Sequence, residues 1–209
     1  MQLLAVATVI RVVFATPQLA PVYLLAMVRV AAATSSRRLR LRGVKRSYSA
    51  AAAAISSGAA IAASVVAATA ALPLDTRQLV PFSAQMIGGA MTATTLASVR
   101  MLDEIASRWA EVEGWLALGA TPREAVADLG RRAAASALVP ALDQTRSVGL
   151  VVLPGAFVGL LLAGASPLEG GRLQLLVLVG LLAAETVAVL VATKMLGLRL
   201  GQEKPREPA

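Results

Sequence analysis

The sequence predicts an all-α, polytopic membrane protein of about six spans with an amphipathic coupling segment outside the bilayer. Hydrophobic residues make up 57% of the 209 residues and charged residues only 15%, whereas a soluble domain carries about 25% charged residues. One soluble core of this size cannot bury so much apolar surface. A spanning helix needs about 20 apolar residues, so the apolar content is enough for roughly six of them.

Apolar runs that alternate with polar breaks locate these spans. The runs cover residues 3–15, 22–33, 50–72, 79–99, 148–163 and 173–196. The first two are short and are separated by Pro17 and Pro21, so they form either two short tilted spans or one broken hairpin. Residues 100–147 are polar and are expected to form one cytoplasmic segment, and residues 197–209 a polar tail. We expect the whole chain to be a single transmembrane domain.

The distribution of positive charge predicts the orientation. The net charge is +8, and 16 of the 20 Lys and Arg residues lie in residues 37–46, in residues 100–147 or from Lys194 onward. Because Lys and Arg mark cytoplasmic loops, we expect these segments and both termini inside, in a multi-pass protein of the plasma (inner) membrane. Arg77 and Arg172 fall in the external breaks. Orientation accounts for the basic charge, so no nucleic-acid partner is expected.

Residues that are absent exclude several kinds of chemistry. The chain contains neither Cys nor His. This excludes disulfides, Cys/His zinc sites, and catalysis by a Cys nucleophile or a His base. The chain also lacks a P-loop signature, so it does not bind ATP through a loop of that kind. We expect no cofactor and no enzymatic activity, and the sequence assigns no metal ligand.

A helix followed by a tight corner is expected within residues 100–147. Apolar residues spaced 3, 4, 3 and 4 apart form one helix face: Leu102, Ile105, Trp109, Val112 and Leu116. Gly119 suits a left-handed helix end. Thr121 then suits an N-cap, Pro122 the first helical position and Glu124 the third, which is a capping box. From these residues alone, a docking element and an ordinary connection on the membrane surface remain equally open.

Two stretches resemble a known family. The corner, with Glu113 six residues before Gly119, is similar to the cytoplasmic EAA-type loop of ABC transporter permeases. Residues 139–174 closely resemble the FetB-type iron-export permeases, a family that includes plant aluminium-tolerance membrane proteins. The residues that match the family pattern are Pro140, Asp143, Gly149, Leu150, Val151, Leu153, Pro154, Gly155, Gly159, Ala163, Gly164, Pro167 and Gln174. Residues 91–97 also fit it.

The resemblance implies a permease that exports iron or another metal ion. It implies a homodimer in the lipid bilayer that binds separate ABC ATPase subunits, which hydrolyse the ATP. The residues implied in coupling to the ATPase are Glu113, Leu118, Gly119, Ala120, Thr121 and Pro122. Family members usually begin with another hydrophobic segment, so we expect one to be missing ahead of Met1.

Candidates for a translocation path lie within the expected spans: Gln85, Met86, Met91, Pro154, Gly155 and Glu185. An intramembrane carboxylate costs about 2.5–3.5 kcal/mol on insertion scales, so Glu185 either binds a cation or lies hydrogen-bonded at a helix interface. The methionines are soft metal ligands or simple apolar filling.

Proline and glycine in the fifth run are also open to two interpretations. Pro154 and Gly155 either free backbone carbonyls toward a cavity or form a packing kink, and the Gly155–Gly159 spacing favours close helix contact. Two other functions remain open for the whole chain. These are a membrane sensor or scaffold without a transport cycle and a membrane-embedded enzyme acting on lipids.

Overall fold

The computed structural model describes residues 2–41, 47–69 and 75–198. The basic residues Arg42, Lys45 and Arg46, the last residues of the third apolar run and the tail from residue 199 lie outside the described residues. Within the described ranges the secondary structure is helical and contains no strand. The predicted all-α membrane fold is therefore confirmed, while the number of spans stays a prediction.

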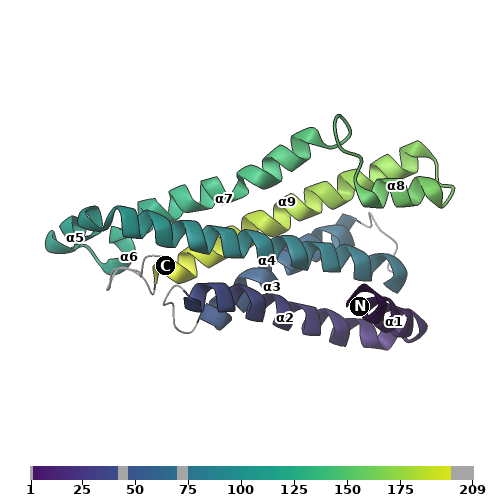
Figure 1. The fold of residues 1–209 in the computed structure, drawn as a ribbon, viewed down its shortest axis with the longest axis horizontal. Coiled ribbons are helices and arrows are strands. Elements are labelled where there is room, and N and C mark those ends of the chain that lie inside the picture. The colour runs from purple at the N-terminus through teal and green to yellow at the C-terminus, as the bar shows by residue number, and fades with distance from the viewer. Residues whose placement is uncertain (1, 42–46, 70–74, 199–209) are drawn as a thin grey trace.

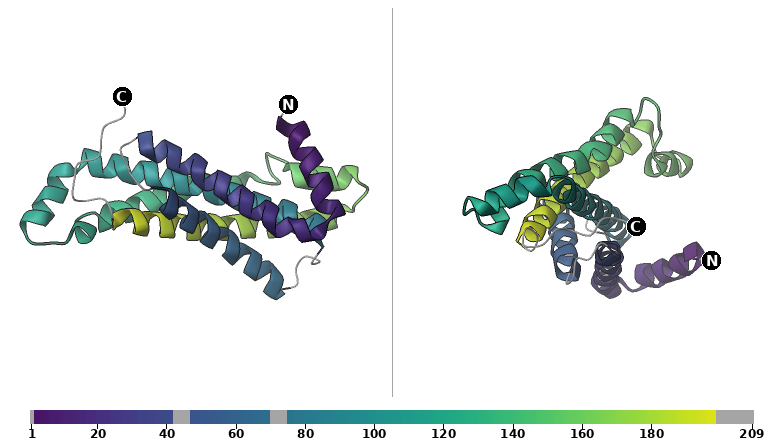
Figure 2. Two further views of the ribbon diagram at one scale, coloured as in Figure 1. Left: turned by 90° about the horizontal axis from the view of Figure 1, so that it is seen from below. Right: turned by 60° about the vertical axis from the view of Figure 1, so that its left-hand side comes forward.

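The helices form an elongated bundle (Figure 1). In chain order they are α1 (Gln2–Ala15), the short 3₁₀ helix η1 (Pro17–Leu19), α2 (Ala20–Leu41), α3 (Ser47–Thr69), α4 (Thr76–Ser107), α5 (Trp109–Ala117), α6 (Pro122–Ala125), α7 (Ala127–Ser147), α8 (Gly155–Leu162) and α9 (Pro167–Gly197). The long helices α2, α3, α4, α7 and α9 run side by side. Helices α5 and α6 extend beyond one end of the bundle, and α1 and α8 lie at the other (Figures 1 and 2).

Small residues let the central helices approach closely. A Cβ atom added to Gly58 of α3 would stand 2.3 Å from the carbonyl oxygen of Ala184 in α9. A Cβ atom on Gly180 of α9 would stand 2.8 Å from the Phe82 ring of α4. Alanines fill much of the remaining contact surface, as at Ala90 and Ala188. Close backbone approach through small residues is typical of helix packing in membranes.

Three described helices are long and apolar enough to cross a membrane: Pro17–Leu39, Ser47–Ala67 and Pro167–Gly197. The fourth apolar run lies inside α4, which continues to Ser107. Helix α4 lies in the same bundle but also carries Arg77 and Arg100.

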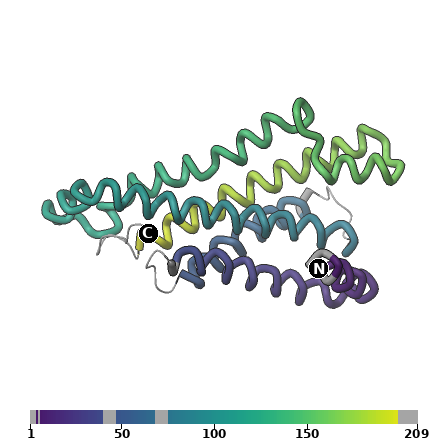
Figure 3. Tube along the Cα trace, viewed as in Figure 1, coloured from purple at the N-terminus to yellow at the C-terminus, as the bar shows by residue number. Residues whose placement is uncertain are grey.

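Residues 100–147, which are expected to form one cytoplasmic segment, are divided among α4, α5, α6 and α7, and their position relative to the membrane stays a prediction. Helix α7 runs back along the bundle and packs on α4 and α9, so that only residues 108–126 project from the end (Figure 3). One face of α7 is small and buried, and includes Leu129, Ala133 and Ala137. The charged residues on the other faces of α7 lower the mean hydropathy of the segment. The buried stripe is therefore not detected by hydropathy. Arg146, at the end of α7, therefore lies at the same bundle end as α8, opposite the end that carries α5 and α6.

The fifth apolar run, residues 148–163, is not a continuous helix. Residues 148–154 form a turn with Gly149 at φ +83°, and α8 has only eight residues. Eight helical residues extend about 12 Å, against about 30 Å for a bilayer core. Along the chain between α4 and α9, the helix that runs from one end of the bundle to the other is therefore α7 and not the fifth run.

The first and last described helices lie at opposite ends of the bundle (Figure 2), and the expectation that both termini are inside stays a prediction. Helix α1 lies at the same end as α8, whereas α9 ends near α5 and α6 (Figure 2). The turn at Thr16 and η1 redirects the chain between α1 and α2. The first run therefore does not run alongside α2 as a hairpin partner.

Candidate functional site

The predicted corner between α5 and α6 is present and is closed by backbone geometry. Gly119 adopts φ +90°, a left-handed conformation that favours glycine. The Gly119 N–H donates to the Leu116 carbonyl, and the Ala120 N–H donates to the Trp115 carbonyl, both at 3.0 Å. These two bonds are a Schellman ending of α5. The prediction that Gly119 ends this helix is confirmed.

The predicted capping box starts α6. The Glu124 N–H donates to Thr121 Oγ1 at 3.3 Å, and Glu124 Oε2 accepts from the Thr121 N–H at 2.8 Å and from its hydroxyl at 2.6 Å. Pro122 occupies the first turn. The hydrogen bonds from the side chain and the backbone of Thr121 hold the pKa of Glu124 below its ordinary value of 4.5. The corner is thus held on both sides.

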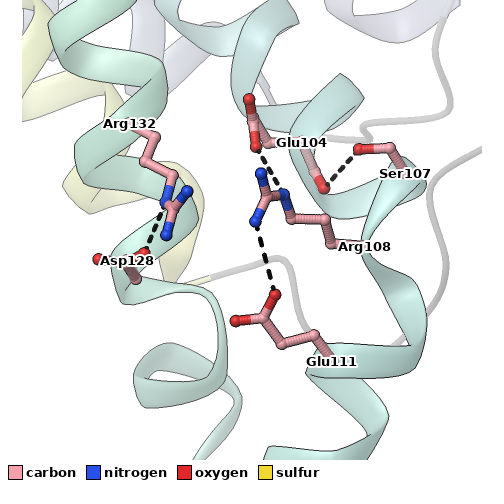
Figure 4. Close-up of polar contacts among 6 residues, drawn as sticks. All are labelled: Glu104, Ser107, Arg108, Glu111, Asp128 and Arg132. Atoms are coloured by element: carbon pink, nitrogen blue, oxygen red, sulfur yellow. Dashed lines mark hydrogen bonds and ion pairs between the residues drawn. The ribbon is translucent and has the colours of Figure 1, made fainter.

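Two ion-pair groups flank the corner (Figure 4). Arg108 Nε lies 3.3 Å from Glu104 Oε2, an i,i+4 pair, and Arg108 Nη1 lies 3.9 Å from Glu111. On α7, Arg132 Nε lies 2.7 Å from Asp128 Oδ2. This hydrogen bond and the positive charge of Arg132 hold the pKa of Asp128 below its ordinary value. The predicted single helix over residues 102–116 is in fact broken at Arg108, where α4 gives way to α5.

An apolar cluster attaches the corner to the bundle. It joins α2, α4, α5, α6, α7 and α9 through Leu39, Met101, Leu102, Ile105, Val112, Ala125, Val126, Leu129, Ala133 and Leu196. The tip remains uncovered, because Leu118 is 83% and Trp115 52% exposed, and Glu113 is exposed beside them. The corner therefore combines an exposed apolar tip with a base that contacts most of the long helices.

Glu185 lies at a narrow crevice between α7 and α9. The crevice is too narrow in this structure to hold a water molecule, and it is lined by Ala141, Gln144, Thr145, Leu178, Leu181, Leu182 and Glu185. Helix α4 closes it on a further side, because a Cβ atom on Gly89 would stand 2.8 Å from Glu185 Oε1. The oxygen-bearing side chains at the crevice are Glu185, Gln144 and Thr145. Oxygen donors suit hard cations.

The other predicted path residues are scattered. Gln85 is exposed on α4, one turn before Gly89. Met86 is fully buried against Phe82 and Val177, and Met91 packs in the cluster around Ala90. Both methionines thus lie in apolar surroundings, and their place in a translocation path stays a prediction.

Pro154 and Gly155 lie at the start of α8, which packs on α9, and they do not kink a span. Nothing lies within 4 Å of a Cβ atom added to Gly155 or Gly159. The predicted close helix contact through these glycines therefore does not occur within one described chain.

The sequence interpretation missed a contact between α4 and α7. Arg100 Nη1 donates to the backbone carbonyl of Ser136, and Pro140 lies four residues after Ser136 in the same helix. Proline has no N–H, so that carbonyl has no helical donor. The signal was Pro140 inside a helical pattern, but sequence alone could not connect the freed carbonyl of Ser136 to an arginine 36 residues before it.

Metal-ligating side chains do not cluster in the part of the chain that the structure describes. No group of three or more His, Cys, Asp or Glu residues there could hold a metal ion. Three buried side-chain oxygens in that part, Thr94 Oγ1, Glu104 Oε2 and Gln174 Oε1, have no hydrogen-bond partner, although Glu104 Oε2 takes part in the ion pair with Arg108.

The sequence is similar to a family of membrane proteins in bacteria and plants. The model of the uncharacterised protein family UPF0014 matches residues 1–200. The rice (Oryza sativa subsp. japonica) UPF0014 membrane protein STAR2 is 36% identical over 195 residues, 92% of this chain and 68% of that protein. Protein ALUMINUM SENSITIVE 3 of Arabidopsis thaliana is 36% identical over 167 residues, 80% of this chain and 60% of that protein.

A bacterial relative carries a functional name. The probable iron export permease protein FetB of Escherichia coli (strain K12) is 28% identical over 191 residues, 91% of this chain and 74% of that protein. No solved structure shows a significant match. The resemblance drawn from residues 139–174 is confirmed by these matches.

Proposed function

Because the chain belongs to the uncharacterised protein family UPF0014, we propose that it is the permease subunit of an ABC transporter that exports iron or another metal ion across the plasma membrane. The name of the Escherichia coli relative supports this role. The observation that supports it most directly is the corner around Gly119, which is rigidly capped, exposed at its tip and packed at its base against the long helices.

In the proposed cycle the corner docks into a cleft of a separate ATPase subunit. The exposed Leu118 and Trp115 provide apolar contact area, and Glu113, Ala120, Thr121 and Pro122 complete the docking element. Large exposed apolar residues of this kind mark interaction sites. The permease functions as a homodimer with two ATPase copies, and ATP-driven closure moves the corner and, through the apolar cluster, the ends of α4, α7 and α9.

The proposed path runs past Glu185, with the exported ion as substrate. The crevice offers one carboxylate and two neutral oxygen-bearing side chains, so a cation passing there replaces part of its hydration shell. Gln85 lies on the same helix one turn from Gly89 and extends this polar surface. A sensor or scaffold remains the alternative, and a lipid-modifying enzyme a weaker one.

The test is reconstitution of the full chain with its ATPase in proteoliposomes, with ATP hydrolysis measured with and without iron and other cations. Gly119→Arg is expected to abolish substrate-stimulated hydrolysis. Gly164→Arg is the matched control, because Gly164 also has φ +90° and open space around its Cβ position but lies between α8 and α9 at the opposite end. Equal loss in both variants, unchanged stimulation in Gly119→Arg, or no co-purifying ATPase would favour the alternative.

A further inference from the structure

Helix α7 contains a break in its hydrogen bonding that another helix repairs. The Ser136 carbonyl would accept the N–H of residue 140 in a regular helix, but residue 140 is proline. Arg100 of α4 donates to that carbonyl instead. Arg100 is partly buried, and a hydrogen bond from a charged donor is stronger than one between neutral groups. One arginine thus bridges α4 to the weakest turn of α7.

The two parts of α7 on either side of Pro140 pack differently. Before it, Leu129, Ala133, Ala134 and Ala137 are buried against α4 and α9. From Pro140 onward, no residue of α7 is buried. Figure 1 shows the later part of α7 leaning away from α4 toward α8. Pro140 therefore separates a fixed part from a part with little packing to hold it.

The loosely packed part, residues 140–147, is also the part that lines the crevice. Ala141, Gln144 and Thr145 form its α7 side, and Glu185 lies on the α9 side. A rotation at Pro140 would widen or close this crevice without disturbing the buried stripe. Helix α7 begins directly after α6, so the same helix connects the corner to the crevice.

We propose that residues 140–147 of α7 are a gate over Glu185 that is hinged at Pro140, and that Arg100 is the positioning residue that latches the hinge through the Ser136 carbonyl. The inference rests on the proposed function, since the gate then controls access of the exported cation. When the latch holds, α7 lies against α9 and the crevice is narrow. When the corner moves, the Arg100 bond breaks and the crevice admits water and the ion.

The test uses the absence of native cysteine in this chain. A single cysteine, Leu182→Cys, is placed on the α9 side of the crevice in the full chain in lipid nanodiscs, and its modification rate by a small charged methanethiosulfonate is measured. Thiolate reactivity follows access to water, so the rate reports opening. Leu190→Cys is the control, because Leu190 is 56% exposed on the same helix and does not line the crevice.

Arg100→Ala is expected to raise the modification rate of Leu182→Cys about tenfold, the effect of losing one hydrogen bond from a charged donor. Pro140→Ala restores the N–H donor to the Ser136 carbonyl. It is expected to slow modification below the wild-type rate. In that background Arg100→Ala should change the rate less than about twofold, since the latch is no longer needed.

Equal acceleration by Arg100→Ala in both backgrounds would overturn the proposal, because Arg100 would then support the bundle in general. If Arg100→Ala does not fold, Pro140→Ala still tests the proposal. Modification of Leu182→Cys at the wild-type rate or faster in the Pro140→Ala background would contradict a hinge at Pro140. The measurement needs no ATPase. Failure of the permease assignment would show as absent ATPase stimulation, whereas failure of the gate would show only in the thiol rates.

Discussion

Gly89 lies directly against Glu185, so that a Cβ atom on Gly89 would stand 2.8 Å from Glu185 Oε1 and 2.4 Å from the Cδ1 atom of Leu181. The missing side chain on α4 makes room for the one carboxylate in the apolar part of α9. The sequence singled out Glu185 but gave no sign that Gly89 lies beside it. Their contact places the crevice at the junction of α4, α7 and α9.

Gly89→Ala is expected to displace Glu185 and to reduce ion transport in proteoliposomes by about tenfold, with a cost in folding stability of about 1–3 kcal/mol for overpacking. Gly88→Ala is the matched control, because nothing lies within 4 Å of a Cβ atom there. Transport that is equal in the two variants would show that the position of Glu185 is unimportant.

Glu185→Leu is expected to abolish transport while leaving thermal stability equal or higher, because removal of an intramembrane carboxylate relieves about 2.5–3.5 kcal/mol on insertion scales. Glu185→Gln keeps the shape and hydrogen-bonding capacity and should lose transport as well, since the charge is gone. Both variants are compared by transport assay and by thermal melting in detergent. If Glu185→Leu transports fully and has a higher melting temperature, Glu185 does not take part in transport.

Gly58→Ala is expected to destabilise the packing of α3 on α9, because the added Cβ would meet a backbone carbonyl oxygen at 2.3 Å, which no rotamer change can relieve. The expected loss is about 1–3 kcal/mol in unfolding free energy, measured by denaturation in mixed micelles. Gly171→Ala, where the Cβ position is open, should be neutral or stabilising because alanine favours helix. Similar destabilisation by both changes would contradict the close approach.

Acid is expected to loosen the corner. The Thr121 hydrogen bonds lower the pKa of Glu124 from 4.5 in the folded state, so the bonds stabilise the corner above that value and are lost as pH falls through the lowered pKa. Fluorescence of Trp109 and Trp115, which are the two tryptophans of the chain, is expected to change in this range. Thr121→Ala should remove the stabilisation at neutral pH and flatten the response. If Thr121→Ala does not alter the dependence of tryptophan fluorescence on pH, that dependence arises from a group other than Glu124.

Local features of the corner were predictable because their causes are local. A left-handed glycine and a capping threonine with a glutamate three residues later act between neighbours in the chain. Gly119, Thr121 and Glu124 therefore occur in the structure as expected. The ATPase that this corner is proposed to bind is a separate matter and stays a prediction.

Helix α7 shows where prediction from hydropathy ends. Its exposed Asp128, Arg131 and Arg132 hide a stripe of small buried residues, and average hydropathy is blind to which face a residue occupies. Hydropathy therefore did not reveal that α7 packs along the bundle, or that residues 148–163 form a turn followed by the short helix α8. Which of these segments cross the membrane stays a prediction.

The membrane class, the all-α fold, the family and the caps of the corner can be predicted from the sequence, because composition, helical periodicity and short motifs depend on neighbouring residues. The return of α7 along the bundle, the hydrogen bond from Arg100 to the carbonyl freed by Pro140, and the contact of Glu185 with Gly89 are known only from the folded structure. These contacts join residues far apart in the chain. They arise from the packing of whole helices. A missing Cβ on one helix or a missing N–H on another has a structural consequence only when a residue of a neighbouring helix packs against it.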